Sequence, residues 1–519
     1  MAAGIHHVTL ITRNVQANVD YYAGFLGLRL VKQTAGFEDA MQLHLFYGDG
    51  AATPGTLVTF LVWEDGSPGR IGHGQTSEIS FAIDPSSIGF WLTRALSFGF
   101  RPEGPMNEFG EPTLRLKDPD GIIVKLVGVS GLETGNPWDA GNILVEHAIK
   151  RIRGATILTE SPEMTLTFLR DNFEYQPAET EGNIQRMKSQ SGDIIDIRDA
   201  QGFWSSAPGT GTIDHIAFRA KDVEDVERLE EKLRSRNAGQ TNTHDRKYFH
   251  SLYVREPGGV LFEFATDGPG MTVDEPSASL GARLFIPEFA PVQGEDARVL
   301  LPQFAMPGEE RVIYRDLPFV HRFYTPETPD GTVFFLLHGS GGNETSLLPL
   351  AHRAAPRATL LGIRGRATDE GTPRWFRRFT PQKFDQKDIR SEAEAFAAFI
   401  AGAIQSYRID PERIAFIGHS NGANFLAAFM LLHPHIVKRA ALLRPSPVLG
   451  DQPAVDLSDT DILLIAGKTD PFSISSAQVA EMLAERNARL DTQWAAAAHD
   501  TGDDDIRLLA NWLGDEART

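Results

Sequence analysis

Two patterns of apolar and polar residues divide the chain into halves. In the first half, short alternating segments recur in one order: a strand, an amphipathic helix, then three more strands. This order predicts four copies of a βαβββ module, at about residues 5–63, 77–129, 152–199 and 212–267. The closing hairpins of the second and fourth copies, KDPDGIIVKLV and REPGGVLFEFA, align without a gap, and each places turn residues between alternating strands.

The second half has a different pattern. Continuous apolar strands such as TVFFLL, RIAFI and DILLIAG are separated by amphipathic helices, which predicts a mostly parallel sheet covered on both faces. Between about residues 268 and 329, Pro, Gly and acidic residues accumulate and predict a tail followed by a connector. We therefore expect an α+β domain over 1–290, a connector over 291–314 and an α/β domain over 315–519.

Composition narrows the functional classes. The 519 residues contain no cysteine, which excludes disulfides, thiolate metal sites and a cysteine nucleophile. A formal net charge of −19 argues against nucleic acid or an anionic membrane as a partner. No apolar run approaches the length of a bilayer span, and the first residues do not resemble a secretory signal, so a cytoplasmic location is expected. The oligomeric state is left open, a homo-oligomer included.

A repeated βαβββ unit whose copies pair into cupped sheets resembles the vicinal-oxygen-chelate architecture, over the whole first half. In that architecture the first and last strands of a module face a metal. His7 in IHHVTL aligns with His215 in IDHIAF on first strands, and Glu263 lies on the last strand of the fourth module. Two histidines and one carboxylate leave open positions on iron(II), as oxygen activation requires. At the matching positions the second module has Glu78 and Lys125.

Several strings in order, including IHHVTLIT, LVKQT, HLFYGD, DHIAF and YVREPGGVLFE, resemble the ring-cleaving dioxygenases that act on hydroquinones, over about residues 4–290. The resemblance implies that His7, His215 and Glu263 bind Fe(II), with Mn(II) as the alternative ion, and that dioxygen is a co-substrate. It also implies a set of residues that line the pocket: His6, Thr9, Arg246 and Tyr253.

Two features of this pocket stay open at this stage. A para-diol offers the metal only one hydroxyl, so the second must be held by the protein, and Tyr253, Arg246 and His6 are the candidates. Strand alternation would turn His6 away from its neighbour His7, and a surface salt bridge is the alternative for Arg246. Asp214 stands where some relatives have a histidine, which leaves the group that handles the substrate proton undecided.

The second half carries a hydrolase pattern. Ser420 lies in Gly-His-Ser-Asn-Gly between an apolar strand and a helix-forming run, the context of a nucleophile elbow. Asp470 and His499 each follow a predicted strand and complete the order Ser, Asp, His of α/β-hydrolases. Backbone N–H groups of Ser340, in the loop HGSGG, and Asn421 are the predicted oxyanion hole. This half resembles the small carboxylesterase and acyl-thioesterase branch, over about residues 315–515.

Nearby charged residues have two interpretations. Arg364, Arg366 and Arg374 follow the second strand and are candidates to bind a carboxylate, although arginine-rich surface loops are common. The acidic run 503–505 is predicted to be a solvated helix start, and Asp500 is a minor rival to Asp470.

The sequence therefore predicts a bifunctional enzyme of aromatic degradation that acts on a small aromatic substrate. Its first half would cleave hydroquinone-type rings, and its second half would hydrolyse the ring-cleavage product or a related ester. Two alternatives for the first half remain: a quinone- or electrophile-binding resistance module, and a glyoxalase-type lyase. The lyases normally use four protein ligands, one more than the three found here.

Overall fold

The computed structural model consists of two compact units. It describes residues 4–133, 135–139, 143–236, 240–288 and 294–514. Unit 1 comprises Met1–Ala297 and Leu301–Glu310, and unit 2 comprises Arg298–Leu300 and Arg311–Thr519. The expected domain boundary at residue 290 and the first connector residues, 291–293, lie outside the described residues.

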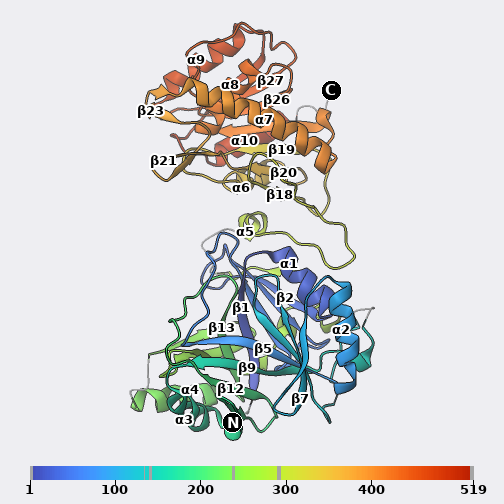
Figure 1. Cartoon of the computed structure of the whole chain (residues 1–519). Helices are drawn as coiled ribbons and strands as arrows, with labels where there is room; N and C mark the ends of the chain where they lie inside the picture. Colours follow the sequence, from blue (N-terminus) through green and yellow to red (C-terminus); the bar gives the residue numbers. More distant parts are fainter. Residues whose placement is uncertain (1–3, 134, 140–142, 237–239, 289–293, 515–519) are drawn as a thin grey trace. The chain divides into compact units, whose positions relative to one another are not determined.

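In unit 1, each repeat folds as a strand, a helix and three further strands, as expected (Figure 1). The first module contains β1 (Ile5–Thr12), α1 (Val15–Val19) continued by a π-helix (Asp20–Phe25), β2 (Arg29–Ala35), β3 (Leu43–Gly48) and β4 (Leu57–Val62). The second contains β5 (Gln75–Ile83), α2 (Ile88–Ser97), β6 (Glu103–Glu108), β7 (Glu111–Lys117) and β8 (Ile123–Gly128). The third contains β9 (Arg151–Thr159), α3 (Pro162–Phe173), β10 (Gln176–Glu181), β11 (Ile184–Lys188) and β12 (Ile194–Asp199). The fourth contains β13 (Thr212–Ala220), α4 (Val223–Ser235), β14 (Thr241–Asp245), β15 (Phe249–Arg255) and β16 (Leu261–Pro269).

Modules pair in a way that brings the two ends of unit 1 together. Modules one and four share a nine-stranded sheet, in which β17 (Leu284–Phe285) of the tail adds the last strand beside β2. Modules two and three share an eight-stranded sheet. Within each module the last strand runs parallel to the first, and the first strands of paired modules are antiparallel. Strands β1, β13 and β16 are consequently neighbours at the centre of one sheet.

Unit 2 is built on a seven-stranded sheet in the order β18-β20-β19-β25-β26-β27-β28. Its strands are β18 (His321–Tyr324), β19 (Val333–Leu337), β20 (Thr359–Ile363), β25 (Ile414–His419), β26 (Arg439–Leu443), β27 (Asp461–Gly467) and β28 (Arg489–Ala495). The strands are parallel except β18, which pairs antiparallel with β20. Two small hairpins follow β20: β21 (Ala367–Asp369) with β22 (Thr372–Arg374), and β23 (Arg378–Thr380) with β24 (Lys383–Phe384).

Helices cover both faces of this sheet. They are α6 (Leu348–Ala354), α7 (Gln386–Tyr407), α8 (Asn421–Leu432), α9 (Ser473–Ala484) and α10 (Asp503–Gly514), while α5 (Gly294–Leu300) is divided between the two units. Successive residues of β19 enter different cores: Phe335 packs with residues of α7 and α8, and Phe334 packs with residues of α6 and α10. The expected combination of paired α+β modules with an α/β domain is confirmed. Within the described residues, no helix is both long and apolar enough to cross a bilayer.

Candidate functional sites

Three predicted metal ligands converge in the centre of the nine-stranded sheet. His7 lies on β1, His215 on β13 and Glu263 on β16, and all three side chains are buried. The Glu263 Oε2 atom lies 3.0 Å from His7 Nε2 and 2.8 Å from His215 Nε2. One ligand atom from each residue lies within 4.8 Å of the other two. The pairing of modules one and four therefore assembles a cluster from positions that are far apart in sequence.

The remaining polar atoms of these side chains are bound elsewhere. Asp214 Oδ2 lies 2.7 Å from His215 Nδ1, and His6 Nδ1 lies 2.8 Å from His7 Nδ1. The Ser251 hydroxyl donates to Glu263 Oε1. By contrast, His215 Nε2 and Glu263 Oε2 are buried without a well-aligned hydrogen bond. Two orphaned ligand atoms beside a third nitrogen donor fit a bound divalent cation.

Electrostatics of the cluster also fit a cation. Burial opposes charge on His215, but the hydrogen bond to Asp214 and the adjacent Glu263 carboxylate outweigh it and raise the His215 pKa to about 9. Burial likewise opposes charge on Glu263, but the charges of His7 and His215 hold the Glu263 pKa well below its usual range. Both shifts favour a positive charge beside the Glu263 carboxylate. A metal ion would supply that charge in place of a proton on His215, because metal-bound imidazole is neutral.

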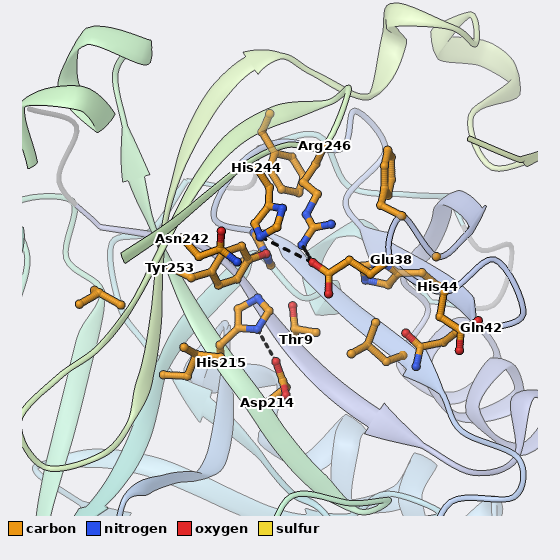
Figure 2. Close-up of a pocket in the computed structure, with 18 of the residues that line it drawn as sticks. Thr9, Glu38, Gln42, His44, Asp214, His215, Asn242, His244, Arg246 and Tyr253 are labelled. Atoms are coloured by element: carbon orange, nitrogen blue, oxygen red, sulfur yellow. Dashed lines mark hydrogen bonds and ion pairs between the residues drawn. The ribbon is translucent and has the colours of Figure 1, made fainter. Parts of the chain in front are cut away.

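A cavity of about 1240 Å³ opens beside His7 and His215. Figure 2 shows residues that line this cavity, and they include the sequence-predicted Thr9, Asp214, Arg246 and Tyr253. Thr9 shares a 2.8 Å hydrogen bond with the hydroxyl of Thr59. Burial, followed by the nearby charge of Glu263, raises the pKa of Tyr253 well above its usual value, which keeps the phenol protonated.

Two of the open points about this pocket have structural answers. His6 is buried, and it is not among the described residues that line the cavity. A register irregularity between Ile5 and His7 places its ring against His7 instead of on the opposite face that simple alternation predicts. Arg246 lines the cavity and also makes a 2.8 Å ion pair with the exposed Glu38.

Sequence reasoning missed other polar residues of the cavity: Glu38, Gln42, His44, Asn242 and His244. His44 Nε2 lies 3.1 Å from the Thr59 hydroxyl, and burial lowers the His44 pKa to about 3. The available signal was a histidine inside the otherwise apolar strand LHLFYG. The matching strand of the fourth module, FHSLYVR, has its histidine one position out of register, so the comparison of modules did not identify His44.

The corresponding position in the eight-stranded sheet is occupied by an ion-pair network. Lys125 Nζ lies 2.9 Å from a carboxylate oxygen of Glu78 and 2.9 Å from one of Glu108. Arg115 Nη2 also binds Glu78, at 2.5 Å. A carboxylate thus stands at the first-strand position that a histidine holds in the other sheet, and it is paired with an ammonium group at the last-strand position of Glu263. This difference explains why only one of the two sheets presents a metal-binding set among the described residues.

In unit 2, a sharp turn presents the predicted nucleophile. Ser420 links β25 to α8 with φ of 50° and ψ of −114°, a conformation that L-residues adopt only when the surroundings impose it. A Cβ atom at Gly422 would lie 2.2 Å from the Leu337 carbonyl oxygen, and one at Gly418 would lie 2.8 Å from the Ala423 nitrogen. Both glycines are therefore needed for the close approach of α8 to β19 and β25.

The three predicted triad residues are joined by hydrogen bonds. Ser420 Oγ lies 2.8 Å from His499 Nε2, and His499 Nδ1 lies 3.0 Å from Asp470 Oδ2. Asp470 is buried, whereas about a third of the His499 side chain is exposed. A hydroxyl, an imidazole and a buried carboxylate in this order can carry out nucleophilic acyl transfer.

Close to the nucleophile, the two residues of the predicted oxyanion hole make side-chain hydrogen bonds to Trp375 and Arg374. Asn421 is the first residue of α8, where backbone N–H groups have no acceptor within the helix. Its side-chain oxygen accepts a 2.9 Å hydrogen bond from the backbone N–H of Trp375. The Ser340 hydroxyl accepts a 2.7 Å hydrogen bond from Arg374 Nη1.

A buried ion pair supports the loop that carries His499. Arg444 and Asp505 are both fully buried, with two contacts of 2.7 and 3.0 Å. Arg444 also donates to the carbonyls of Ala498, Asp500 and Ile465, so each of its five N–H groups has an acceptor. The expectation that 503–505 form a solvated helix start is wrong for Asp505, because this carboxylate neutralises a buried guanidinium.

Comparison with known proteins identifies both parts. The model of the glyoxalase/bleomycin resistance protein/dioxygenase superfamily matches residues 4–126 and 151–264. MhqO of Bacillus subtilis, named as a ring-cleaving dioxygenase, is 37% identical over 310 residues, which are 59% of this chain and 97% of MhqO. The chlorohydroquinone/hydroquinone 1,2-dioxygenase of Sphingobium indicum is 31% identical over 309 residues, 57% of this chain and 95% of that protein.

A second kind of relative accounts for much of the remaining length. MhqD of Bacillus subtilis, named as a hydrolase, is 30% identical over 191 residues, which are 36% of this chain and 95% of MhqD. Each of these three relatives is matched over at least 95% of its own length. The chain therefore belongs to the glyoxalase/bleomycin resistance protein/dioxygenase superfamily, as a fusion of a part similar to ring-cleaving dioxygenases with an α/β-hydrolase part.

Proposed function

We propose that unit 1 is an Fe(II)-dependent dioxygenase that opens hydroquinone-type rings, with Mn(II) as the alternative ion. The observation that supports it best is the buried set His7, His215 and Glu263 at the wall of a large cavity. The name of the Sphingobium indicum relative points to hydroquinones as the substrate class. We further propose that unit 2 hydrolyses the ring-cleavage product or a related ester.

His7, His215 and Glu263 would hold the ion, which supplies the activation of dioxygen when bound. Asp214 would accept the Nδ1 proton of His215 and so direct the Nε2 lone pair toward the ion. His6 would do the same for His7 from outside the cavity.

Two further residues would act on the substrate hydroxyl that lies away from the ion. Tyr253 remains a neutral phenol and can donate a hydrogen bond to it. Arg246 brings a positive charge to the same cavity wall, held in place by Glu38.

In unit 2, His499 Nε2 would take the proton of Ser420 Oγ during attack on an acyl carbon and return it to the leaving group. Asp470 would keep the other proton on His499 Nδ1 and stabilise the imidazolium. Backbone N–H groups of Ser340 and Asn421 would stabilise the developing oxyanion.

Anaerobic iron reconstitution, followed by oxygen-electrode assays on hydroquinones and catechols with product mass, tests this assignment. Glu263→Ala should abolish oxygen uptake and leave ester hydrolysis intact, while Ser420→Ala should do the reverse. A chain that takes up no iron would favour a binding module for quinones or electrophiles. Turnover of methylglyoxal with a thiol, without oxygen consumption, would favour a glyoxalase-type lyase.

The coupling of the two steps needs its own test. If unit 2 acts on the product of unit 1, that product should be hydrolysed with a higher kcat/KM than unrelated esters. Equal activity on both would refute the coupling and leave the two separate activities standing.

A further inference from the structure

We propose that the hydrolase site of unit 2 selects acyl substrates that carry a second, anionic group such as a carboxylate, and that Arg374 binds this group. The inference rests on the proposed serine-hydrolase function and specifies its substrate class. It starts from the three arginines that follow β20, Arg364, Arg366 and Arg374, which differ in what neutralises them.

Two of these arginines are fully engaged by carboxylates of their own. Arg366 makes two contacts of 2.8 and 2.9 Å with Glu392. Arg364 binds both oxygens of Glu344, one of them at 2.6 Å. A carboxylate that binds a planar guanidinium through both oxygens neutralises its charge and occupies its donors, so the guanidinium binds a further anion weakly.

Arg374 shares its counter-ion with another arginine. Its Nε lies 3.3 Å from Oδ2 of Asp369, and Arg378 Nε lies 2.8 Å from the same oxygen. Two guanidinium groups thus face one carboxylate, which leaves a net positive charge. The Arg374 Nε is also buried without a well-aligned hydrogen bond, and burial lowers the Arg374 pKa. An anion would supply the missing charge and acceptor.

The backbone around Arg374 is attached to both predicted oxyanion groups. On one side, the Gly341 N–H donates to the Pro373 carbonyl at 2.9 Å, which joins it to the loop of Ser340. On the other side, the Trp375 N–H donates to the Asn421 side chain at 2.9 Å. The Arg374 guanidinium itself donates to the Ser340 hydroxyl. Its positive charge is therefore held next to the place where the acyl group of the substrate would bind.

The proposed chemistry of unit 1 generates such an anion. When dioxygen opens a ring beside a hydroxyl-bearing carbon, both oxygen atoms enter the product. The hydroxyl-bearing carbon becomes a carboxyl group, and its former neighbour becomes an aldehyde or another carbonyl. A ring-opened substrate for unit 2 would thus carry a carboxylate at neutral pH, and Arg374 is the matching group.

Two p-nitrophenyl esters of equal chain length test the proposal with the full chain: the anionic monosuccinate and the neutral butyrate. In wild type we expect a higher kcat/KM for the monosuccinate. Arg374→Met should lower the ratio of the two kcat/KM values by about 10- to 100-fold, the range for a charge-assisted hydrogen bond, mainly through KM for the anionic ester. Arg374→Lys, which keeps the charge but not the paired donors, should retain part of the preference. Arg366→Met is the matched control and should leave the ratio unchanged, because Glu392 already neutralises Arg366.

An unchanged ratio in Arg374→Met would overturn the proposal. This includes an equal loss of kcat/KM for both esters, since Arg374 would then act only by positioning Ser340. The proposed function fails separately: if Ser420→Ala still hydrolyses either ester at the wild-type rate, unit 2 is not a serine hydrolase with this triad.

Discussion

The buried pair of Arg444 and Asp505 offers a quantitative test of how unit 2 holds His499, its proposed catalytic histidine. Both side chains are fully buried, and the guanidinium uses all five N–H groups on two carboxylate oxygens and three carbonyls. Two of those carbonyls, of Ala498 and Asp500, flank His499 in the chain. The perturbation is Arg444→Met, which keeps the aliphatic length and removes the charge and every donor.

The loss is expected to be large because Asp505 would remain as an unpaired buried charge. Removing one partner of such a pair typically costs about 3 to 5 kcal/mol. For a unit of this size, each kcal/mol lowers the midpoint of thermal unfolding by roughly 2 to 4 °C, so a fall of about 6 to 20 °C is expected. The rate of ester hydrolysis should also be reduced at temperatures below the new midpoint, because the loop of His499 loses its two hydrogen-bonded carbonyl contacts to Arg444.

Calorimetry of the full chain measures the midpoint, and residual esterase activity after heating identifies which transition belongs to unit 2. Arg489→Met is the matched control: Arg489 also binds both oxygens of an aspartate, Asp461, but its side chain is 59% exposed. Its loss should cost about 1 kcal/mol or less. The double variant Arg444→Met/Asp505→Leu should recover much of the stability, because no charge remains buried.

The reasoning is refuted if Arg444→Met is no more destabilising than Arg489→Met. It is also refuted if the double variant is as unstable as Arg444→Met alone. In either case the buried charge would not be the source of the cost.

Three other predictions concern single residues. Asp470→Asn should lower kcat for ester hydrolysis by about 10⁴-fold and leave oxygen uptake unchanged, because the His499 tautomer is lost; a loss below tenfold would exclude Asp470 as the orienting group. Asp214→Asn should weaken metal binding by about 10- to 100-fold in competition with a chelator, because His215 loses its carboxylate partner; unchanged affinity would contradict that role. The pKa of His44 is about 3 in the fold, below the 6.5 of an exposed histidine, so the neutral ring contributes stability that is present above pH 6.5 and lost as the pH falls. This can be measured by urea unfolding of metal-free protein between pH 4 and 6.5. For each unit by which the pH falls, the free energy of unfolding of wild type should decrease by up to about 1.4 kcal/mol more than that of His44→Gln. Parallel plots of this free energy against pH for the two proteins would show that His44 does not titrate in this way.

Much of the architecture follows from local patterns. Apolar alternation of period two and helical periodicity depend only on neighbouring residues, so the four βαβββ modules and the alternating strands and helices of unit 2 were predictable. The repeat also made His7, His215 and Glu263 visible as framework positions, because copies of one module can be compared directly. The order of Ser420, Asp470 and His499 needed only the strands that precede them.

Tertiary structure decided what depends on distant partners. Periodicity does not say which strands pair, so only the fold shows that modules one and four share a sheet and bring the three predicted ligands together. A register irregularity, set by the β1–β13 pairing, placed His6 against His7 where alternation predicts the opposite face.

Charge partners were equally hidden from the sequence. Asp505 was expected to be solvated because it begins a helix, yet Arg444 reaches it from another strand end and both are buried. Among Arg364, Arg366 and Arg374, the sequence shows three equivalent residues in one loop region. The fold distinguishes them, because Glu344 and Glu392 arrive from separate helices and loops to neutralise two, and leave Arg374 to share a single aspartate.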